Sequence, residues 1–416
     1  MESQSLIKEK KTFFHTMAEL LFTVYLITLY VFVDRKETLM LSKLAFLAFA
    51  GVTVLHLLQR KRFHLGKNMM LVYVCFSWMF ISTTWAMNSY VASNRTTTLW
   101  QVFLLFFLVY NLFCENENIY EGFLRKLYIA GIFLIGYSIY TYGFTGVVKM
   151  MMQDHNIRLG KEISHENIFG MKNATTCIIA FYYLFYRVRH KLFHIIILSS
   201  SFLLAMSSGS RKALLMTCAG ILFLVYQKYG IRKVYKIVAI VLVLALVFSI
   251  VIQLPVFETI RHRMEQLGET LSGGKGDSSS KTRLNMIKEG WRVFKERFLI
   301  GYGANNYRIA SRYRTYSHNN FIEMLVDFGL IGFTLYYLAY WNAFKNLTKS
   351  KEGEAKALLC IFLIRFAMEM AVVTYYDKTN WIMLAIFLIK CKIPDNNVDG
   401  GEKNEMLSAQ NQQSYN

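Results

Sequence analysis

Long apolar runs with almost no charge recur along the whole chain, and they limit its fold more than any other feature. A helix needs about 20 residues, at a rise of about 1.5 Å each, to cross the hydrocarbon core of a bilayer. Backbone N–H and C=O groups find no water there, so only helices or closed barrels can cross. The runs are solid and do not alternate between apolar and polar residues, which favours helices. The sequence therefore predicts an all-α polytopic membrane protein.

Twelve of these runs are candidate spans, which predicts about twelve transmembrane helices. They are Phe13–Val33, Leu39–Leu58, Met69–Trp85, Leu99–Phe113, Leu127–Tyr142, Phe169–Tyr186, Leu192–Met206, Lys212–Tyr226, Val234–Leu254, Phe321–Phe344, Ala357–Tyr375 and Trp381–Ile389. An even number places both termini on one side of the membrane. Gln59–Lys67 and Gln227–Lys236 would face that side, and each carries four basic residues. Because Lys and Arg accumulate in cytoplasmic loops, we predict that both termini are cytoplasmic.

The net charge of +20 would suggest a nucleic-acid partner if the chain were soluble. In a membrane protein the loop bias explains most of this charge, so the expected partner is the lipid bilayer and no nucleic acid. The six cysteines form no CxxC pair, and the sequence contains no HExxH or DxD motif. It therefore predicts neither a metal site nor a cofactor. The lack of a Walker A sequence disfavours ATP-driven transport.

One predicted outer loop, residues 255–317, is much longer than the others. Its 63 residues include twelve basic and six acidic ones, whereas a connection usually has only a few residues. From Lys281 onward, apolar residues at steps of three and four predict an amphipathic helix that ends at Gly301–Gly303. We expect this helix to lie along the membrane surface, with its apolar face toward lipid or the bundle. That face consists of Leu284, Ile287, Trp291, Phe294 and Phe298.

These features divide the chain into three parts. Residues 1–206 are predicted to form an N-terminal transmembrane bundle, and residues 207–390 a C-terminal region that includes the loop 255–317. Residues 391–416 are polar and rich in Asn and Gln. Such a composition cannot bury enough apolar surface to fold, so we expect a disordered cytoplasmic tail.

Two arginines are candidate phosphate ligands. Arg211 follows the predicted outer turn Ser207–Ser210 and begins the next span. Backbone N–H groups at a helix N-terminus, joined by a guanidinium, suit a phosphate. Arg283 stands near the start of the amphipathic helix. Spacing alone favours simpler interpretations: an interfacial arginine at position 211 and a solvated surface charge at position 283.

His318 is the candidate base. It stands at the outer start of the span Phe321–Phe344, close in sequence to Arg312 and Arg314. A helix N-terminus and nearby cations both disfavour the imidazolium form. A neutral imidazole can accept a proton from a sugar hydroxyl. The alternative is a histidine that only caps the helix, and the sequence pattern leaves both interpretations open.

Three sequence marks occur in order around the long loop. The first is the turn Ser207–Arg211. The second begins at Arg283-Leu284, includes Trp291, and reaches Leu299-Ile300-Gly301-Tyr302-Gly303-Ala304-Asn305-Asn306. The third is His318–Glu323 followed by Gly329–Gly332. Together they resemble the O-antigen ligase/polymerase superfamily, which includes O-antigen ligases and Wzy-type polymerases of oligosaccharide repeat units, over roughly Ser207 to Tyr340. Leu299-Ile300 replaces the proline usual before the first glycine.

The resemblance implies a GT-C-like, metal-independent, inverting glycosyltransferase of the bacterial cytoplasmic membrane, without a cofactor. Its donor would be a glycan on undecaprenyl pyrophosphate at the outer face. Arg211 and Arg283 would hold the pyrophosphate, with Arg312 and Arg314 as further binding groups, and His318 would activate the acceptor hydroxyl. Arginines can replace a metal at such a leaving group, because its negative charge grows in the transition state. A chain-length regulator protein is a further implied partner.

The acceptor glycolipid separates two functions within the superfamily. A Wzy-type polymerase extends a surface polysaccharide, such as capsule or lipopolysaccharide, by transfer onto another lipid-linked repeat unit. An O-antigen ligase transfers the glycan to lipid A-core. The Lys-rich composition and Tyr375-Tyr376-Asp377 favour the polymerase.

A polysaccharide flippase is the alternative from another functional class. It should line a route with buried charges, and the ionisable residues inside spans are few: Glu19, Lys43, Lys172, Arg365 and Glu369. Arg365 and Glu369 are four residues apart, which predicts an ion pair on one helix face.

Overall fold

A computed structural model describes residues 12–32, 37–116, 118–143, 158–187, 189–233, 278–350 and 352–389, with a few single positions between these ranges. Within them all regular structure is helical and there is no strand, which confirms the all-α prediction. The predicted span Val234–Leu254 lies almost wholly outside the described residues. The first part of the long loop, 255–277, and the tail 391–416 also lie largely or wholly outside them.

The helices follow the predicted runs closely. They are α1 (Phe13–Val31), α2 (Leu39–Arg60), α3 (Lys67–Ile81), the 3-10 turn η1 (Ser82–Trp85), α4 (Ser89–Phe113), α5 (Ile119–Tyr142), α7 (Glu166–Tyr186), α8 (Lys191–Ser207), α9 (Arg211–Tyr229), η2 (Ile231–Lys233), α12 (Ser278–Glu296), α13 (Tyr307–Ala310), α14 (Asn320–Lys349), α15 (Gly353–Met368) and α16 (Lys378–Phe387). Among the described helices, α1, α2, α4, α5, α7 and α14 are long and apolar enough to cross a membrane. A multi-pass membrane protein is thus supported, and the count of about twelve spans stays a prediction.

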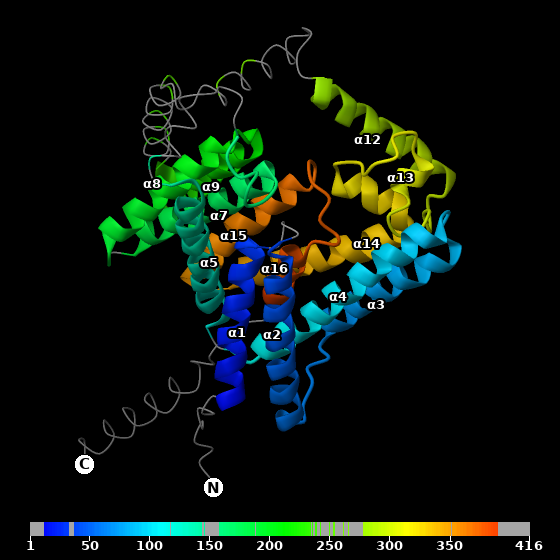
Figure 1. Cartoon of the computed structure of the whole chain (residues 1–416), viewed down its shortest axis with the longest axis horizontal. Helices are drawn as coiled ribbons and strands as arrows, with labels where there is room; N and C mark the ends of the chain where they lie inside the picture. Colours follow the sequence, from blue (N-terminus) through cyan, green and yellow to red (C-terminus); the bar gives the residue numbers. More distant parts are fainter. Residues whose placement is uncertain are drawn as a thin grey trace, which may run out of the picture.

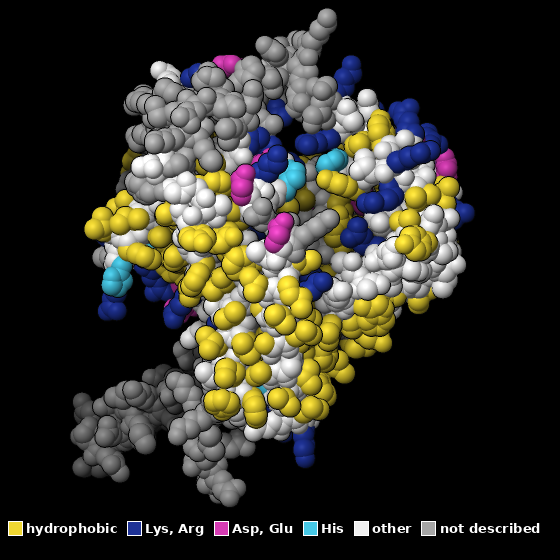
Figure 2. All heavy atoms as spheres, in the orientation of Figure 1, with side chains coloured by type: hydrophobic (Ala, Val, Ile, Leu, Met, Phe, Trp, Pro, Cys, Tyr) yellow, Lys and Arg dark blue, Asp and Glu magenta, His cyan; other side chains and the backbone are white. Residues whose placement is uncertain are grey.

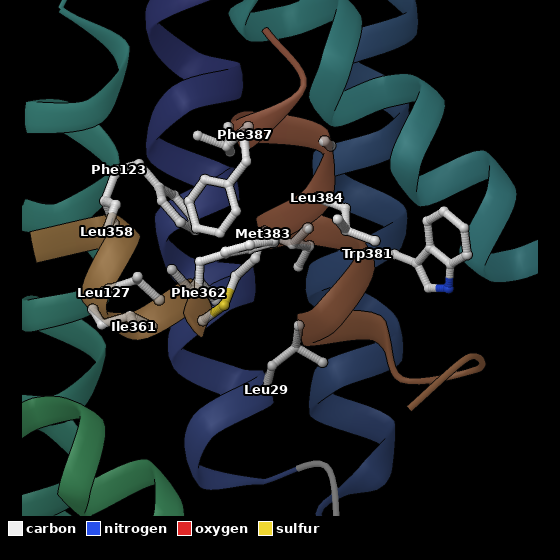
Figure 3. Close-up of a cluster of buried hydrophobic side chains, with 14 of the residues drawn as sticks. Leu29, Phe123, Leu127, Leu358, Ile361, Phe362, Trp381, Met383, Leu384 and Phe387 are labelled. Atoms are coloured by element: carbon white, nitrogen blue, oxygen red, sulfur yellow. The ribbon is translucent and has the colours of Figure 1, made fainter. Parts of the chain in front are cut away.

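The helix α16 forms the centre of the bundle. Every residue from Asn380 to Ile389 is buried, and a helix that is apolar on all sides belongs in a core. Its side chains meet those of α1, α5 and α15 (Figure 3): Leu29, Phe123, Leu127, Leu358, Ile361, Phe362, Trp381, Met383, Leu384 and Phe387. With ten residues, α16 is about 15 Å long, too short to cross a bilayer alone.

Two groups of helices flank this centre (Figure 1). On one side α7, α8 and α9 pack together, and on the other α3 and α12 lie against α14. The helix α4 packs on α16 and extends toward the second group. Residues 300–306 also contact residues 85–95, so the N-terminal half takes part in building the second group.

The helix α12 confirms the predicted amphipathic helix but buries a different stripe. Met286, Gly290 and Val293 are buried, at steps of four and three. A Cβ atom added to Gly290 would lie 2.2 Å from Cγ2 of Ile322, so only glycine permits this approach of α12 to α14. Leu284, Trp291 and Phe298 of the predicted apolar face are about half exposed and point away from this contact. The apolar residues are thus shared between α14 and the outer surface.

The predicted ion pair between Arg365 and Glu369 is wrong. The buried Glu369 carboxylate accepts hydrogen bonds from the Asn320 side chain and from four hydroxyl groups, on Tyr336, Tyr337, Tyr340 and Thr374. Arg365 instead lines a small internal space beside Tyr340 and Asn380. Neutral donors satisfy the carboxylate because α14 and residues 369–376, here called the 370s segment, bring their hydroxyl groups close to it. Arg365, one helical turn before Glu369, forms no ion pair with it.

Other ionisable residues within spans also have structural partners. Lys172 Nζ donates to the backbone oxygens of Leu29 and Tyr30, each at 3.0 Å, near the end of α1. The Asn116 amide donates to Glu19 Oε1 at 2.7 Å. Lys43 is exposed on α2. These contacts join neighbouring helices and do not form a continuous charged route through the described bundle.

Candidate functional site

The start of α14 carries the candidate base. Asn319 is the N-cap, and its side-chain oxygen accepts from the N–H of Ile322 at 3.0 Å. His318 therefore does not cap this helix, which removes the alternative interpretation of that residue. It precedes the cap in a left-handed conformation, with φ of 57°. Its ring lies 4.1 Å, centroid to centroid, from the ring of Tyr316.

His318 is held in its neutral form by its surroundings. Partial burial, followed by the charges of Arg283, Lys212 and His165, lowers its pKa to about 4. These three residues come from α12, α9 and the N-cap of α7. Three segments far apart in the sequence thus converge on one imidazole. At neutral pH the ring can accept a proton.

The turn between α8 and α9 has the predicted form. The helix α8 ends at Ser207 and α9 begins at Arg211. Ser210 caps α9, because its hydroxyl accepts from the N–H of Ala213 at 3.4 Å. Arg211 is half-buried at the first position of the helix. The next residue, Lys212, donates through Nζ to the Ala371 backbone oxygen at 2.6 Å, which ties α9 to the segment after α15.

The segment before α7 covers this turn. Arg158 Nε donates to the Ser208 backbone oxygen at 2.9 Å, and the Leu159 N–H donates to the Ser207 oxygen at 3.0 Å. Gly170 of α7 faces Ser208 so closely that a Cβ atom there would lie 2.3 Å from the hydroxyl oxygen. This packing sets His165, at the start of α7, beside the same region.

The glycines of the second and third sequence marks fit against one another. Gly301 and Gly329 have φ of 69° and 66°. A Cβ atom added to either glycine would come within 2.6 Å of the backbone of the opposite segment. The N–H of Tyr302 donates to the Val326 oxygen at 2.8 Å, and that of Gly303 to the Asp327 oxygen at 2.8 Å. Gly329 interrupts the helical geometry inside α14, which makes these bonds possible.

Asp327 fixes the turn that follows. Its buried carboxylate accepts from the backbone N–H groups of Asn305 and Tyr307, both at 2.7 Å, and from the Tyr375 hydroxyl at 3.0 Å. Each hydrogen bond of this kind typically contributes about 0.5–1.5 kcal/mol, and a buried N–H left without a partner would cost more. Residues 301–307 are therefore set rigidly against α14, eleven residues before the base.

Asn320 connects the base to the 370s segment. Its backbone N–H donates to the Glu369 oxygen at 2.7 Å, and its side-chain oxygen accepts from the N–H groups of Thr374 and Tyr375. The same segment receives the Lys212 ammonium at Ala371. His318, Lys212 and the segment 369–376 are consequently held in one arrangement.

The predicted site residues do not all meet. His318 and Arg283 come together, and Arg211 lies at the turn next to Lys212. Arg312 is exposed and lies near Glu289 of α12, whose pKa is lowered by Arg292 and, to a smaller extent, by Arg312. Arg314 is exposed, with φ of 54°. The cations that act on the base are therefore not its sequence neighbours.

Lys212 and His165 were not among the predicted site residues. Lys212 follows Arg211 directly, so the same turn could have indicated it as a site residue. It was predicted to lie inside a membrane span, which argued against a role at the outer face. His165 lies in the shorter outer loop Gly143–Ile168, and no sequence pattern relates it to His318. Within the described ranges, no group of three His, Cys, Asp or Glu side chains is arranged to hold a metal ion. Metal independence stays a prediction.

The face of the molecule shown in Figure 2 is hollowed between the α7–α9 group and the α12–α14 group. Lys and Arg side chains surround the hollow, and histidines lie on both of its sides. Apolar side chains cover much of the surface below it. The arrangement suits a ligand with an anionic group and an apolar tail.

Comparison with known proteins assigns the region that builds this site. A family model described as O-antigen ligase matches residues 176–337, from within α7 to within α14. The match includes the α8–α9 turn, α12, the interlocking glycines and His318, but neither α4 nor the 370s segment. A search of curated proteins finds no match. The resemblance to the O-antigen ligase/polymerase superfamily is thereby confirmed over residues 176–337, which match the O-antigen ligase family model.

Proposed function

We propose that this protein is an inverting glycosyltransferase of the bacterial cytoplasmic membrane that polymerises repeat units of a surface polysaccharide. Its donor is an oligosaccharide on undecaprenyl pyrophosphate, bound at the outer face. The observation that carries the proposal is the convergence of Arg283, Lys212 and His165 on His318. His318, Arg283 and Lys212 lie inside the region that matches O-antigen ligase, and His165 lies before it. The convergence supplies a neutral base and an anion site in one place without a metal.

The proposed transfer is a single displacement. The acceptor hydroxyl attacks the anomeric carbon, and a new glycosidic bond forms as the bond from that carbon to the pyrophosphate oxygen breaks. The pyrophosphate leaves with the bonding electron pair, and His318 takes the hydroxyl proton. Cations beside the leaving group stabilise the charge that it gains. A base of this kind contributes about 10²–10⁴-fold to the rate.

Arg283 and Arg211 are the proposed ligands of the pyrophosphate, with Lys212 as a third cation. A guanidinium can bind two phosphate oxygens at once, whereas an ammonium acts as a point charge. Lys212 is already tied to the Ala371 oxygen, so we assign it to the electrostatics of the site and the arginines to the direct contacts. Arg312 and Arg314 are assigned to the rim, because both are exposed.

A ligase that transfers to lipid A-core is the closest alternative, and both functions fit the match to the O-antigen ligase family model. A flippase is a weaker one, because Lys172, Glu369 and Glu19 have structural partners between helices. The Tyr375-Tyr376-Asp377 segment lies beside the site through Asn320, and we take it as a contact for a second lipid-linked substrate. The cytoplasmic location of both termini belongs to the same proposal.

The intermediate that accumulates when the gene is deleted distinguishes these functions. We expect single repeat units on undecaprenyl pyrophosphate at the outer face. A ligase deletion would instead accumulate finished polymer on undecaprenyl pyrophosphate. A flippase deletion would accumulate single units that an impermeant reagent cannot reach in intact cells. Mass spectrometry of the lipid fraction, with and without such a reagent, separates the three, and either of the last two results would refute the polymerase.

A further inference from the structure

Two further arginines lie close to the same site but outside the cations that act on His318. Arg95 of α4 places its guanidinium carbon 3.7 Å from the centroid of the Tyr376 ring and donates through Nη2 to Asn305 Oδ1 at 3.3 Å. Arg308 belongs to the short helix α13, three residues after Asn305. Both are therefore positioned by the turn that Asp327 holds against α14.

Both guanidiniums contain a buried donor without a partner. The Nε atoms of Arg95 and Arg308 are buried and form no hydrogen bond with the described part of the chain. Within that part, neither arginine has a carboxylate within ion-pair distance, and Arg308 has no hydrogen-bond partner. A buried donor left unpaired costs about 1–3 kcal/mol, and more when it is charged. Native proteins leave few such donors, so each one calls for an explanation.

The buried carboxylates nearby are committed elsewhere. Both oxygens of Asp327 accept from backbone N–H groups, and one also accepts from the Tyr375 hydroxyl. Glu323 accepts from the N–H of Ser317 at 2.7 Å. The charges of Arg308 and Arg95 also act on Glu323, but no ion pair joins them, and the Nε donors of both arginines stay without a partner in the described part of the chain. These donors can bind an anion that comes from outside the chain.

The position of this pair relates it to the base. Burial raises the pKa of Tyr376, while Arg95 and, more weakly, Arg308 lower it. Tyr316 also acts on Tyr376, and the Tyr316 ring lies 4.1 Å, centroid to centroid, from the His318 ring at a tilt of 49°. Tyr376 and Tyr316 therefore link Arg95 and Arg308 to His318, whereas the charges of Arg283 and Lys212 act on His318 directly.

We propose that Arg95 and Arg308 bind a phosphate group of the acceptor glycolipid, as a second anion site beside the donor site. This inference rests on the proposed function. In a single displacement the attacking hydroxyl and the leaving pyrophosphate lie on opposite sides of the anomeric carbon. An acceptor with its own phosphate therefore needs cations apart from those that hold the donor. The cation–π contact with Tyr376 fixes the plane of the Arg95 guanidinium for this purpose.

Two acceptors carry this chemistry. A polymerase would place the pyrophosphate of a second undecaprenyl-linked unit on Arg95 and Arg308, whereas a ligase would place a phosphate of lipid A there. The shared feature is a phosphate on a lipid-anchored glycan. Arg95 and Tyr376 lie outside the matched region 176–337, so the acceptor site combines that region with α4 and the 370s segment.

The test counts lipids bound to the purified full-length protein in nanodiscs by native mass spectrometry, with undecaprenyl pyrophosphate as the probe. We expect two bound molecules for the wild type, one for Arg308→Gln and one for Arg283→Gln, and none for the double variant. Loss of one charged contact should weaken the affected site by about 10- to 100-fold. Arg308→Gln is the primary variant because the Nε atom of Arg308 is buried without a hydrogen-bond partner in the described structure. Arg95→Lys, which keeps the charge, is the second.

The control is Arg292→Gln, an exposed arginine of α12 that pairs with Glu289 and Glu296, and it should still bind two. A parallel titration with lipid A distinguishes the acceptors: a lipid A bound in an Arg308-dependent way, beside one undecaprenyl pyrophosphate, supports the site in a ligase. If one undecaprenyl pyrophosphate is lost in Arg283→Gln and none is lost in Arg308→Gln, the acceptor site is overturned and the proposed function is not. If no bound undecaprenyl pyrophosphate is lost in Arg283→Gln, the proposed function itself is overturned.

Discussion

The two sides of the hollow are built in different ways. The α14 side, residues 297–329, is held by backbone hydrogen bonds across Gly301, Gly303 and Gly329 and by the buried Asp327 carboxylate. The α9 side, residues 158–170 and 207–212, is held by capping side chains and by arginine and lysine contacts to carbonyl oxygens. The α14 side carries the base and, on the adjoining α12, the cation Arg283, whereas the α9 side supplies Lys212 and His165. A base must stand within hydrogen-bond reach of its substrate, whereas a cation acts over a longer distance, which explains why the base belongs to the more rigid side.

The largest expected effect follows from His318→Asn on the α14 side. Asparagine tolerates a left-handed backbone, so the fold should survive, but its amide cannot accept the proton. We expect transfer to fall by about 10²–10⁴-fold. The measurement is polymer formed in membranes that contain equal amounts of protein. Binding of undecaprenyl pyrophosphate should be unchanged, and near-normal polymer would show that the base lies elsewhere.

Gly329→Ala tests the rigidity of the same side. Gly329 has φ of 66° and ψ of −172°, a conformation that essentially only glycine adopts and that costs other residues about 1–3 kcal/mol. The new Cβ would also lie 2.2 Å from the Leu299 oxygen. We expect a lower melting temperature and less protein in the membrane. Gly136→Ala is the matched control, because nothing lies within 4 Å of its added Cβ in α5, and helix propensity favours alanine. Equal melting temperatures for the two variants would contradict the interlocking backbone.

Arg283→Gln tests the electrostatic part of the comparison through pH. The pKa of His318 is lowered to about 4 by burial first and then by Arg283, so the base is neutral above that pH. Removal of the cation makes protonation easier and raises the pKa toward its ordinary value of 6.5. The residual activity should therefore decline at a higher pH than in the wild type as the medium is acidified. A pH–rate profile of both proteins measures the shift. If activity falls at the same acidic pH in the variant and the wild type, Arg283 does not influence the pKa of His318.

Arg292→Gln should have the smallest effect. This arginine is exposed on α12 and pairs with Glu289 and Glu296 on its own helix. Exposed pairs of this kind contribute little to stability, because water and salt screen them. Polymer formation and its pH profile should match the wild type, in contrast to Arg283→Gln on the same helix. A loss comparable to that of Arg283→Gln would mean that the net charge of α12, and no particular position, governs activity.

The sequence by itself determined the helical membrane fold and the region that carries the site. Solid apolar runs admit only one secondary structure in a bilayer, so the spans around α1 and α7 could be placed within a few residues. The helix α4 begins at Ser89, well before its predicted span Leu99–Phe113. A turn is also a local feature, and the start of α9 at Arg211 followed from the turn Ser207–Ser210. The marks at Arg283 and His318 indicated the superfamily, which the domain match confirms.

Only the tertiary structure decided which residues meet. Arg312 and Arg314 adjoin His318 in the sequence, yet Arg283, Lys212 and His165 act on it in space. The expected pair of Arg365 and Glu369 fails for the same reason, because Tyr336, Tyr337 and Tyr340 reach the carboxylate from another helix. Burial, close backbone approach at Gly290 and the second arginine pair at Arg95 and Arg308 likewise depend on how helices cross. Periodicity fixes the faces of one helix, whereas contacts between helices far apart in the chain arise only when the bundle packs.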